Sequence, residues 1–146
     1  MQSESLAGTG VEFFWPISPS AVAEFAQLTG DDHPIHVDDA AAREAGLPGR
    51  IVQGSYLVAI MANAASRFFK NARRSGLSYG YDKLRFTSPV ATNDTLHVKY
   101  EIGEHDPTTG RMRADVSITK SNGELAVVAV HLTKCFEPRD LAVSAD

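Results

Sequence analysis

The sequence predicts an α+β fold in which a curved antiparallel sheet wraps around one long central helix. Two observations lead to this fold class. Residues 55–70 (SYLVAIMANAASRFFK) contain neither glycine nor proline, and most of their first half is apolar or small. After this segment, apolar and polar residues alternate in strand-length stretches separated by short turn sequences, a pattern typical of antiparallel hairpins.

Two shorter helices are expected before the central one. Ser18 followed by Pro19 is typical of an N-cap and a first helical position, and Gly30 stops the apolar stripe that follows. Asp38 is expected to open a second short helix that runs through Ala45. The central helix, at about 1.5 Å per residue, would be roughly 24 Å long. Because its first half has no clear polar face, we expect other structure to enclose it.

Three strands are expected after the central helix. Apolar residues alternate with polar ones over residues 96–102 and 112–118, so each strand has one face inward and one in water. Residues 125–132 are apolar nearly throughout, which favours a strand covered on both faces. Turn-forming residues occupy 106–110 and 121–123. Hairpins of this kind, curved around a buried helix, form the hot-dog fold.

The composition is that of an ordinary globular protein. The chain of 146 residues suits a single domain over 1–146, with frayed termini at about 1–10 and 137–146. A formal net charge of −4 argues against nucleic acid or an anionic membrane as a partner, and no apolar stretch reaches the roughly 20 residues of a membrane-spanning helix. The lone Cys135 and the lack of a signal-peptide pattern favour a cytoplasmic protein.

Residues 31–36 (DDHPIH) concentrate acid/base chemistry in one loop. Two carboxylates and two imidazoles lie within this segment, which predicts a general acid/base centre. Read from the residues alone, Asp31 is equally suited to capping the next segment. A metal site built from Asp31, His33, His36 and Asp38 is disfavoured, because Pro34 disrupts a helical His pair and the spacing matches no zinc motif.

The stretch around this loop resembles the signature of the R-specific enoyl-CoA hydratases and MaoC-like dehydratases. That signature runs Gly-Asp-x-Asn-Pro-aliphatic-His, and residues 30–36 (GDDHPIH) match it except that His33 replaces the Asn. The likeness continues through Val52-Gln53-Gly54, where Gln53 replaces a frequent His, and through residues 85–96 (RFTSPVATNDTL). It covers about residues 12 to 134.

The resemblance implies a hydro-lyase that adds or removes water across the α,β double bond of an acyl thioester. It assigns Asp31 and His36 to the reacting water. The N–H of Gly54, at the start of the central helix, is the natural donor to the enolate oxygen, since a helix N-terminus offers free N–H groups and partial positive charge. Three neighbouring residues are candidate substrate-binding positions: His33, Gln53 and Ser55.

The resemblance and the predicted fold also indicate which partners to expect. Coenzyme A or acyl carrier protein would arrive as part of the substrate, and no metal or redox cofactor is required for proton transfer. A homodimer or higher homo-oligomer is expected, because pairing two sheets covers their open edges. Two alternatives stay open: a hot-dog acyl-CoA thioesterase and a non-catalytic acyl-thioester-binding paralogue. A serine hydrolase is disfavoured, because the chain has no Gly-x-Ser-x-Gly motif.

Overall fold

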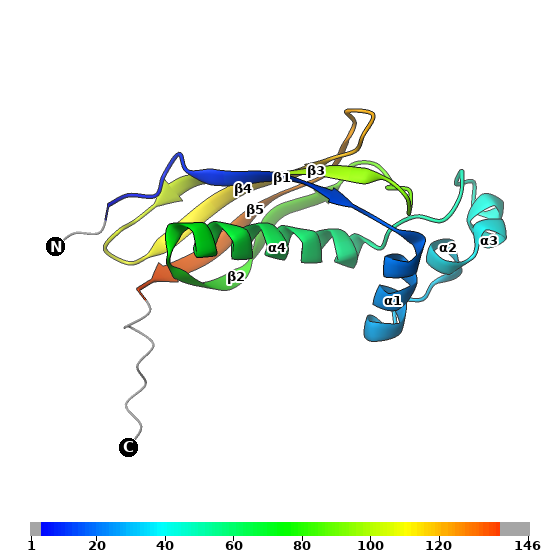
Figure 1. Cartoon of the computed structure of the whole chain (residues 1–146), viewed down its shortest axis with the longest axis horizontal. Helices are drawn as coiled ribbons and strands as arrows, with labels where there is room; N and C mark the ends of the chain where they lie inside the picture. Colours follow the sequence, from blue (N-terminus) through cyan, green and yellow to red (C-terminus); the bar gives the residue numbers. More distant parts are fainter. Residues whose placement is uncertain (1–3, 138–146) are drawn as a thin grey trace, which may run out of the picture.

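A long helix, α4 (Gly54–Ala72), lies along one face of a five-stranded antiparallel sheet in this computed structural model, which describes residues 4–137 (Figure 1). The strand order across the sheet is β1-β3-β4-β5-β2. The strands are β1 (Gly10–Pro16), β2 (Ser75–Phe86), β3 (Thr95–His105), β4 (Arg111–Thr119) and β5 (Leu125–Phe136). The predicted hot-dog arrangement is confirmed.

Three short helices gather at one end of the sheet, where α4 begins (Figure 1). They are α1 (Pro19–Thr29), α2 (Pro34–Val37) and α3 (Asp39–Glu44). The Ser18 hydroxyl accepts a 3.1 Å hydrogen bond from the N–H of Ala21, and Gly30 ends α1 in the left-handed conformation at φ 77°. The Asp38 carboxylate accepts from the N–H of Ala40 at 2.8 Å and caps α3. Both helices were predicted from these caps.

Two strands and one helix were not expected from the sequence. β1 pairs with β3 and β2 pairs with β5, so these two strands form the edges of the sheet. The loop after α1 also contains a helical turn, α2, because Pro34 occupies its first position and the Nδ1 atom of His33 caps it by accepting from the N–H of Ile35 at 3.4 Å. Proline therefore starts a helix here rather than only ending one.

The core lies between the sheet and one side of α4. The buried residues of this helix are Leu57, Ile60, Met61, Ala64, Ala65, Phe68 and Phe69. They pack in one hydrophobic cluster with inward residues of the strands, such as Leu96 and Tyr100. Another side of α4 carries small residues at four exposed positions: Ser55, Ala59, Ala62 and Ser66. The expectation that other structure encloses α4 therefore does not hold for this face, within the described residues 4–137.

The third predicted strand also differs in part from expectation. Buried and partly buried residues alternate along most of β5, so its second face is only half covered. Its inward-facing residues include the polar His131 and Thr133, which are 2% and 1% exposed. The inner face of this strand is therefore not uniformly apolar.

Of the expected frayed termini at about 1–10 and 137–146, residues 1–3 and 138–146 lie outside the described range. Within that range, the segment before β1 bonds to β3. The N–H of Leu6 donates to His105 Nδ1 at 3.0 Å, and the N–H of Gly8 donates to the carbonyl of Ile102 at 2.7 Å. No helix of residues 4–137 is long and apolar enough to cross a membrane.

Candidate active site

Asp31 and His36 face one another beside the start of α4. Asp31 follows the end of α1, and His36 lies in the single turn of α2. The Oδ1 atom of Asp31 is 4.0 Å from the Nε2 atom of His36. The two side chains are 42% and 10% exposed, so the carboxylate reaches solvent while the imidazole is nearly enclosed. The structure therefore brings together the two residues that the loop motif singled out.

The backbone of Ile51 determines which ring nitrogen of His36 is free. The Nδ1 atom of His36 lies 2.7 Å from the carbonyl oxygen of Ile51. Because a carbonyl can only accept, Nδ1 carries the hydrogen and the neutral ring presents an unprotonated Nε2. Nε2 is the ring nitrogen that lies 4.0 Å from Asp31 Oδ1, so it is available to accept a proton at the site. Nothing in the sequence pattern identifies Ile51 as the residue that sets this tautomer.

Ser55 holds the other oxygen of the Asp31 carboxylate. Its hydroxyl donates a 3.0 Å hydrogen bond to Asp31 Oδ2. Oδ2 is thereby occupied, whereas Oδ1 is turned toward His36. Ser55 was a candidate substrate-binding residue, and the structure places it against the carboxylate of Asp31.

Gly54 begins α4, and its N–H belongs to the first turn of that helix. The N-cap residue is Gln53, which makes no side-chain capping bond, so the first N–H groups of α4 are not satisfied by a cap. A Cβ atom added to Gly54 would come within 3.0–3.3 Å of the Phe86 ring. The ring therefore covers one side of the helix start. The absence of a side chain at Gly54 leaves room for this ring. Phe86 is a neighbour of the site that the motif did not indicate.

Gln53 lies behind the site rather than in it. Its side chain is fully buried, and its Nε2 atom donates to the carbonyl of Val22 at 3.0 Å and to that of Asp31 at 3.4 Å. Its Oε1 atom is buried without a hydrogen-bond partner among the described residues. Gln53 therefore ties α1 and the start of the loop at Asp31 to the beginning of α4.

His33 contributes to the shape of the loop. Besides capping α2, its ring lies 6.5 Å from that of His36, centroid to centroid, in an edge-to-face arrangement. The residue is exposed. Its exposed position is compatible with the expected substrate-binding role, and its bond to the N–H of Ile35 also anchors the loop.

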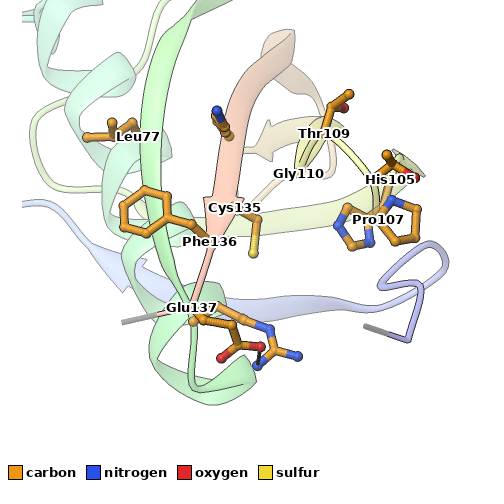
Figure 2. A pocket seen from close by; sticks show the side chains of 11 residues that line it. Leu77, His105, Pro107, Thr109, Gly110, Cys135, Phe136 and Glu137 are labelled. Atoms are coloured by element: carbon orange, nitrogen blue, oxygen red, sulfur yellow. Dashed lines mark ion pairs between the residues drawn. The ribbon is translucent and has the colours of Figure 1, made fainter. Parts of the chain in front are cut away.

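A hollow of about 470 Å³ lies at the end of the sheet away from Asp31 and His36 (Figure 2). Figure 2 shows Cys135 with Phe136 on one side and with His105 and Pro107 on the other. Burial raises the pKa of the Cys135 thiol, which keeps it in its unreactive protonated form. None of the six candidate site residues lines this hollow. Within residues 4–137, no three His, Cys, Asp or Glu side chains are grouped to hold a metal ion.

Known proteins are similar to this chain in both sequence and architecture. Residues 4–124 match the family model of the MaoC like domain. The chain is 32% identical over 112 residues to the 3-hydroxybutyryl-CoA dehydratase of Methylorubrum extorquens, a match that covers 77% of this chain and 68% of that protein.

Solved structures agree with this match. R-hydratase PhaJ1 from Pseudomonas aeruginosa is 26% identical with a TM-score of 0.74, over 90% of this chain and 82% of that one. An (R)-hydratase from A. caviae involved in PHA biosynthesis shares the fold at a TM-score of 0.79 and 23% identity, over 92% of this chain and 98% of that one.

The fold and these matches define a hot-dog enzyme of the hydratase/dehydratase class. The chain belongs to the MaoC-like dehydratase family. The family resemblance seen in residues 30–36 is thereby confirmed.

Proposed function

We propose that this protein interconverts an α,β-unsaturated acyl thioester and its 3R-hydroxy form, with Asp31 and His36 as the groups that handle the proton. The observation that carries the proposal is the pairing of Asp31 Oδ1 with the free Nε2 of His36, 4.0 Å apart, beside the first turn of α4. A carboxylate and an imidazole on one water, next to unpaired backbone donors, are the groups that hydration requires.

The separation of the two side chains suits a water between them. At 4.0 Å the two atoms are too far apart for a direct hydrogen bond. A water placed to one side of the line between them donates one hydrogen to Asp31 Oδ1 and the other to His36 Nε2. Its two lone pairs are then directed away from the pair, and one of them can face the substrate for attack on the β carbon.

The proton balance follows from this arrangement. As the water oxygen bonds to the β carbon, one of its O–H bonds breaks and the proton passes to the Asp31–His36 pair. The double-bond electrons move toward the thioester carbonyl and form an enolate. The pair then delivers the proton to the α carbon, which completes the addition and restores both side chains. Dehydration is the same sequence in reverse.

Stabilisation of the enolate oxygen is assigned to the N–H of Gly54. The first N–H groups of a helix lack intrahelical acceptors and carry partial positive charge. The absence of a side chain at Gly54 allows the thioester to approach the backbone, and Phe86 shields one side from water. One such donor contributes about 10²–10³ in rate.

The test is an assay with crotonyl-CoA that follows enoyl absorbance and free thiol together. Loss of absorbance without thiol release is the expected result. Thiol release would assign the protein to the thioesterases instead. Tight binding with neither signal, across several chain lengths and with carrier-protein thioesters as well, would indicate a protein that only binds acyl thioesters.

We propose further that the reaction uses no metal or redox cofactor. Proton transfer by Asp31 and His36 and one backbone donor account for each step of the addition. Dialysis against a strong chelator is expected to leave the hydration rate unchanged. A rate that falls and returns on adding a divalent cation would contradict this.

The protein is also proposed to form a homodimer through the free edge of β2. This edge strand exposes three large apolar side chains, Leu77, Tyr79 and Phe86, at 57%, 58% and 51%. Pairing two such edges would cover them and extend the sheet. Replacing Leu77 and Tyr79 with lysine is expected to give monomers in sedimentation analysis, whereas a dimer that persists would place the interface elsewhere.

The proposal also covers the metabolic role of the protein and its location in the cell. A role in fatty-acid metabolism and a cytoplasmic location are supported by the acyl-thioester chemistry and by the single cysteine, which cannot form an internal disulfide. Fractionation of cells that express a tagged chain tests the location directly.

A further inference from the structure

A groove of about 490 Å³ runs along α4 from Ser55, beside the proposed site. Its first lining residue is Ser55, whose hydroxyl holds Asp31 Oδ2. From there the groove follows the face of α4 that carries Val58, Ala59 and Ala62, with β2 and β5 as its other wall. These short side chains leave a largely apolar passage, and Ser55 connects its near end to Asp31 of the proposed reaction centre.

The two ends of the groove can be assigned from contacts between α4 and β2. At one end, Phe86 of β2 lies against Gly54. At the other end, Gly76 of β2 lies against the Phe69 ring so closely that an added Cβ would overlap it. Strand and helix therefore run in opposite directions along the groove. From Ser55 to the level of Ser66 the helix extends roughly 16 Å, which separates the far end from the site of chemistry.

The far end of the groove is polar, and a chain of hydrogen bonds runs there from the buried Tyr100 through the buried His131 to the exposed Ser78. The hydroxyl of Tyr100 lies 2.9 Å from His131 Nδ1, and His131 Nε2 lies 2.8 Å from the hydroxyl oxygen of Ser78. Tyr100 is 1% exposed, and its hydroxyl has no other hydrogen-bond partner among the described residues. Its proton is therefore donated to Nδ1, which leaves the hydrogen of the neutral ring on Nε2. His131 then donates to Ser78, so the hydroxyl hydrogen of Ser78 is free to point elsewhere.

Thr133 adds a second unused hydroxyl at the same level. It is the cross-strand partner of Ser78, and it lines the groove. The residue is 1% exposed, and its hydroxyl oxygen has no hydrogen-bond partner among the described residues. A buried hydroxyl without a partner is costly in an apolar setting, so a rotation of the Thr133 side chain that brought its hydroxyl to an acceptor in the groove would be favourable.

We propose that this groove selects acyl chains that carry a neutral oxygen, a hydroxyl or keto group, at the end remote from the thioester. The inference rests on the proposed function, since it assigns the groove to the acyl part of the same substrate. The thioester end would lie at Gly54, the alkyl part along Ala59 and Ala62, and the distal oxygen would accept from Ser78 and Thr133.

The charge of the far end favours a neutral group over a carboxylate. Burial lowers the pKa of His131 to about 4, so its ring is uncharged near neutrality. No lysine or arginine lines the groove. A carboxylate placed there would lose its hydration without gaining a cationic partner, whereas a hydroxyl or carbonyl oxygen gains two hydrogen bonds.

The experiment compares α,β-unsaturated acyl-CoA substrates of equal length that end in a methyl, a hydroxyl, a keto or a carboxylate group. Hydration kinetics are measured for the wild-type protein and for Thr133→Val and Ser78→Ala. Thr119→Val, on the outward face of β4, is the matched control. Each variant is expected to lower kcat/KM for the hydroxyl and keto substrates by roughly two- to tenfold, as loss of one neutral hydrogen bond implies, and to leave the methyl substrate unchanged.

Binding of the saturated analogues by calorimetry separates this inference from the proposed function. If the methyl substrate is hydrated at least as well as the hydroxyl and keto ones, the inference is overturned and the proposed function stands. If no substrate is hydrated but the oxygenated analogues bind more tightly and lose that advantage in Thr133→Val, the hydratase function fails and the oxygen site stands. Preference for the carboxylate, or equal losses for all substrates in both variants, would also overturn the inference.

Discussion

The hydroxyl of Ser55 donates a 3.0 Å hydrogen bond to Asp31 Oδ2, and so links the first turn of α4 to the loop that follows α1. This bond fixes the rotation of the Asp31 carboxylate and leaves Oδ1 facing His36. Ser55 thus acts as a positioning residue, and the proposed chemistry depends on the geometry that it maintains.

Replacement of Ser55 with alanine tests this positioning role. Ser55→Ala is expected to lower kcat for hydration about tenfold, because the carboxylate loses one charge-assisted bond and is free to rotate. KM should change little, because this hydroxyl is bonded to Asp31 rather than left free for the substrate. Ser117→Ala, on β4, serves as the control. A threonine at position 55 should restore much of the rate, and an unchanged kcat in Ser55→Ala would remove Ser55 from the mechanism.

Asp31 and His36 are each expected to be essential for hydration. Asp31→Asn and His36→Ala should each lower kcat by about 10²–10⁴, because each removes one of the two groups that share the proton. Circular dichroism should show an unchanged fold. Asp32→Asn, which alters an exposed neighbouring carboxylate, is expected to retain normal turnover. Near-normal turnover in either catalytic variant would show that the assignment of these residues is wrong.

The N–H of Gly54 can be removed by substitution with proline, without shortening α4. Proline is well tolerated at a first helical position, and Gln53 has φ −61° and ψ 138°, a conformation that a following proline permits. Gly54→Pro lacks the N–H and is expected to lower kcat by about 10²–10³.

Gly54→Ala is the matched control for that substitution. It also crowds the Phe86 ring but keeps the N–H, so it should lose much less activity than Gly54→Pro. Equal losses in the two variants would assign the effect to crowding rather than to the missing donor.

Gln53 is expected to matter for stability more than for chemistry. Gln53→Ala removes two hydrogen bonds to backbone carbonyls and leaves a space in a fully buried position. The free energy of unfolding should fall by about 2–4 kcal/mol, measured by urea denaturation. Gln27→Ala, at an exposed position of α1, should change it by less than about 0.5 kcal/mol. A Gln53→Ala protein as stable as the wild type would contradict the anchoring role.

His131 is expected to make the protein less stable in mild acid. Its pKa in the folded protein is lowered to about 4 by burial, whereas the unfolded chain should titrate near the ordinary value of 6.5. Between these values the unfolded state binds the proton and the folded state does not, so stability falls as the pH drops from about 6.5 to 4. Unfolding at pH 7 and pH 5 should therefore show a larger loss for the wild type than for His131→Gln. Parallel losses would exclude His131 as the source.

Periodicity and capping residues were sufficient to predict α1, α3, α4 and the three strands β3 to β5. The edge strands were missed for physical reasons. β1 contains adjacent aromatic residues in place of an alternating pattern, and β2 contains two glycines and two register irregularities that interrupt its period. Edge strands are held mainly by pairing with a neighbour, which leaves little trace in the local sequence.

The candidate site was likewise predicted from the sequence only in part. The motif in residues 30–36 and the glycine at the start of α4 were sufficient to name Asp31, His36 and Gly54 as candidates. No local pattern, however, could show that Ile51 sets the tautomer of His36, or that Ser55 holds Asp31 across 24 positions of sequence.

The sequence by itself determined the family, the hot-dog architecture and the identity of the acid/base candidates, because those depend on residue type and short-range spacing. Only the tertiary structure decided how these groups face one another, that Gln53 is an internal anchor, and that the groove along α4 ends in the hydroxyls of Ser78 and Thr133. These features depend on which segments pack together and on where each buried polar atom finds its hydrogen-bond partner, and long-range packing alone settles both.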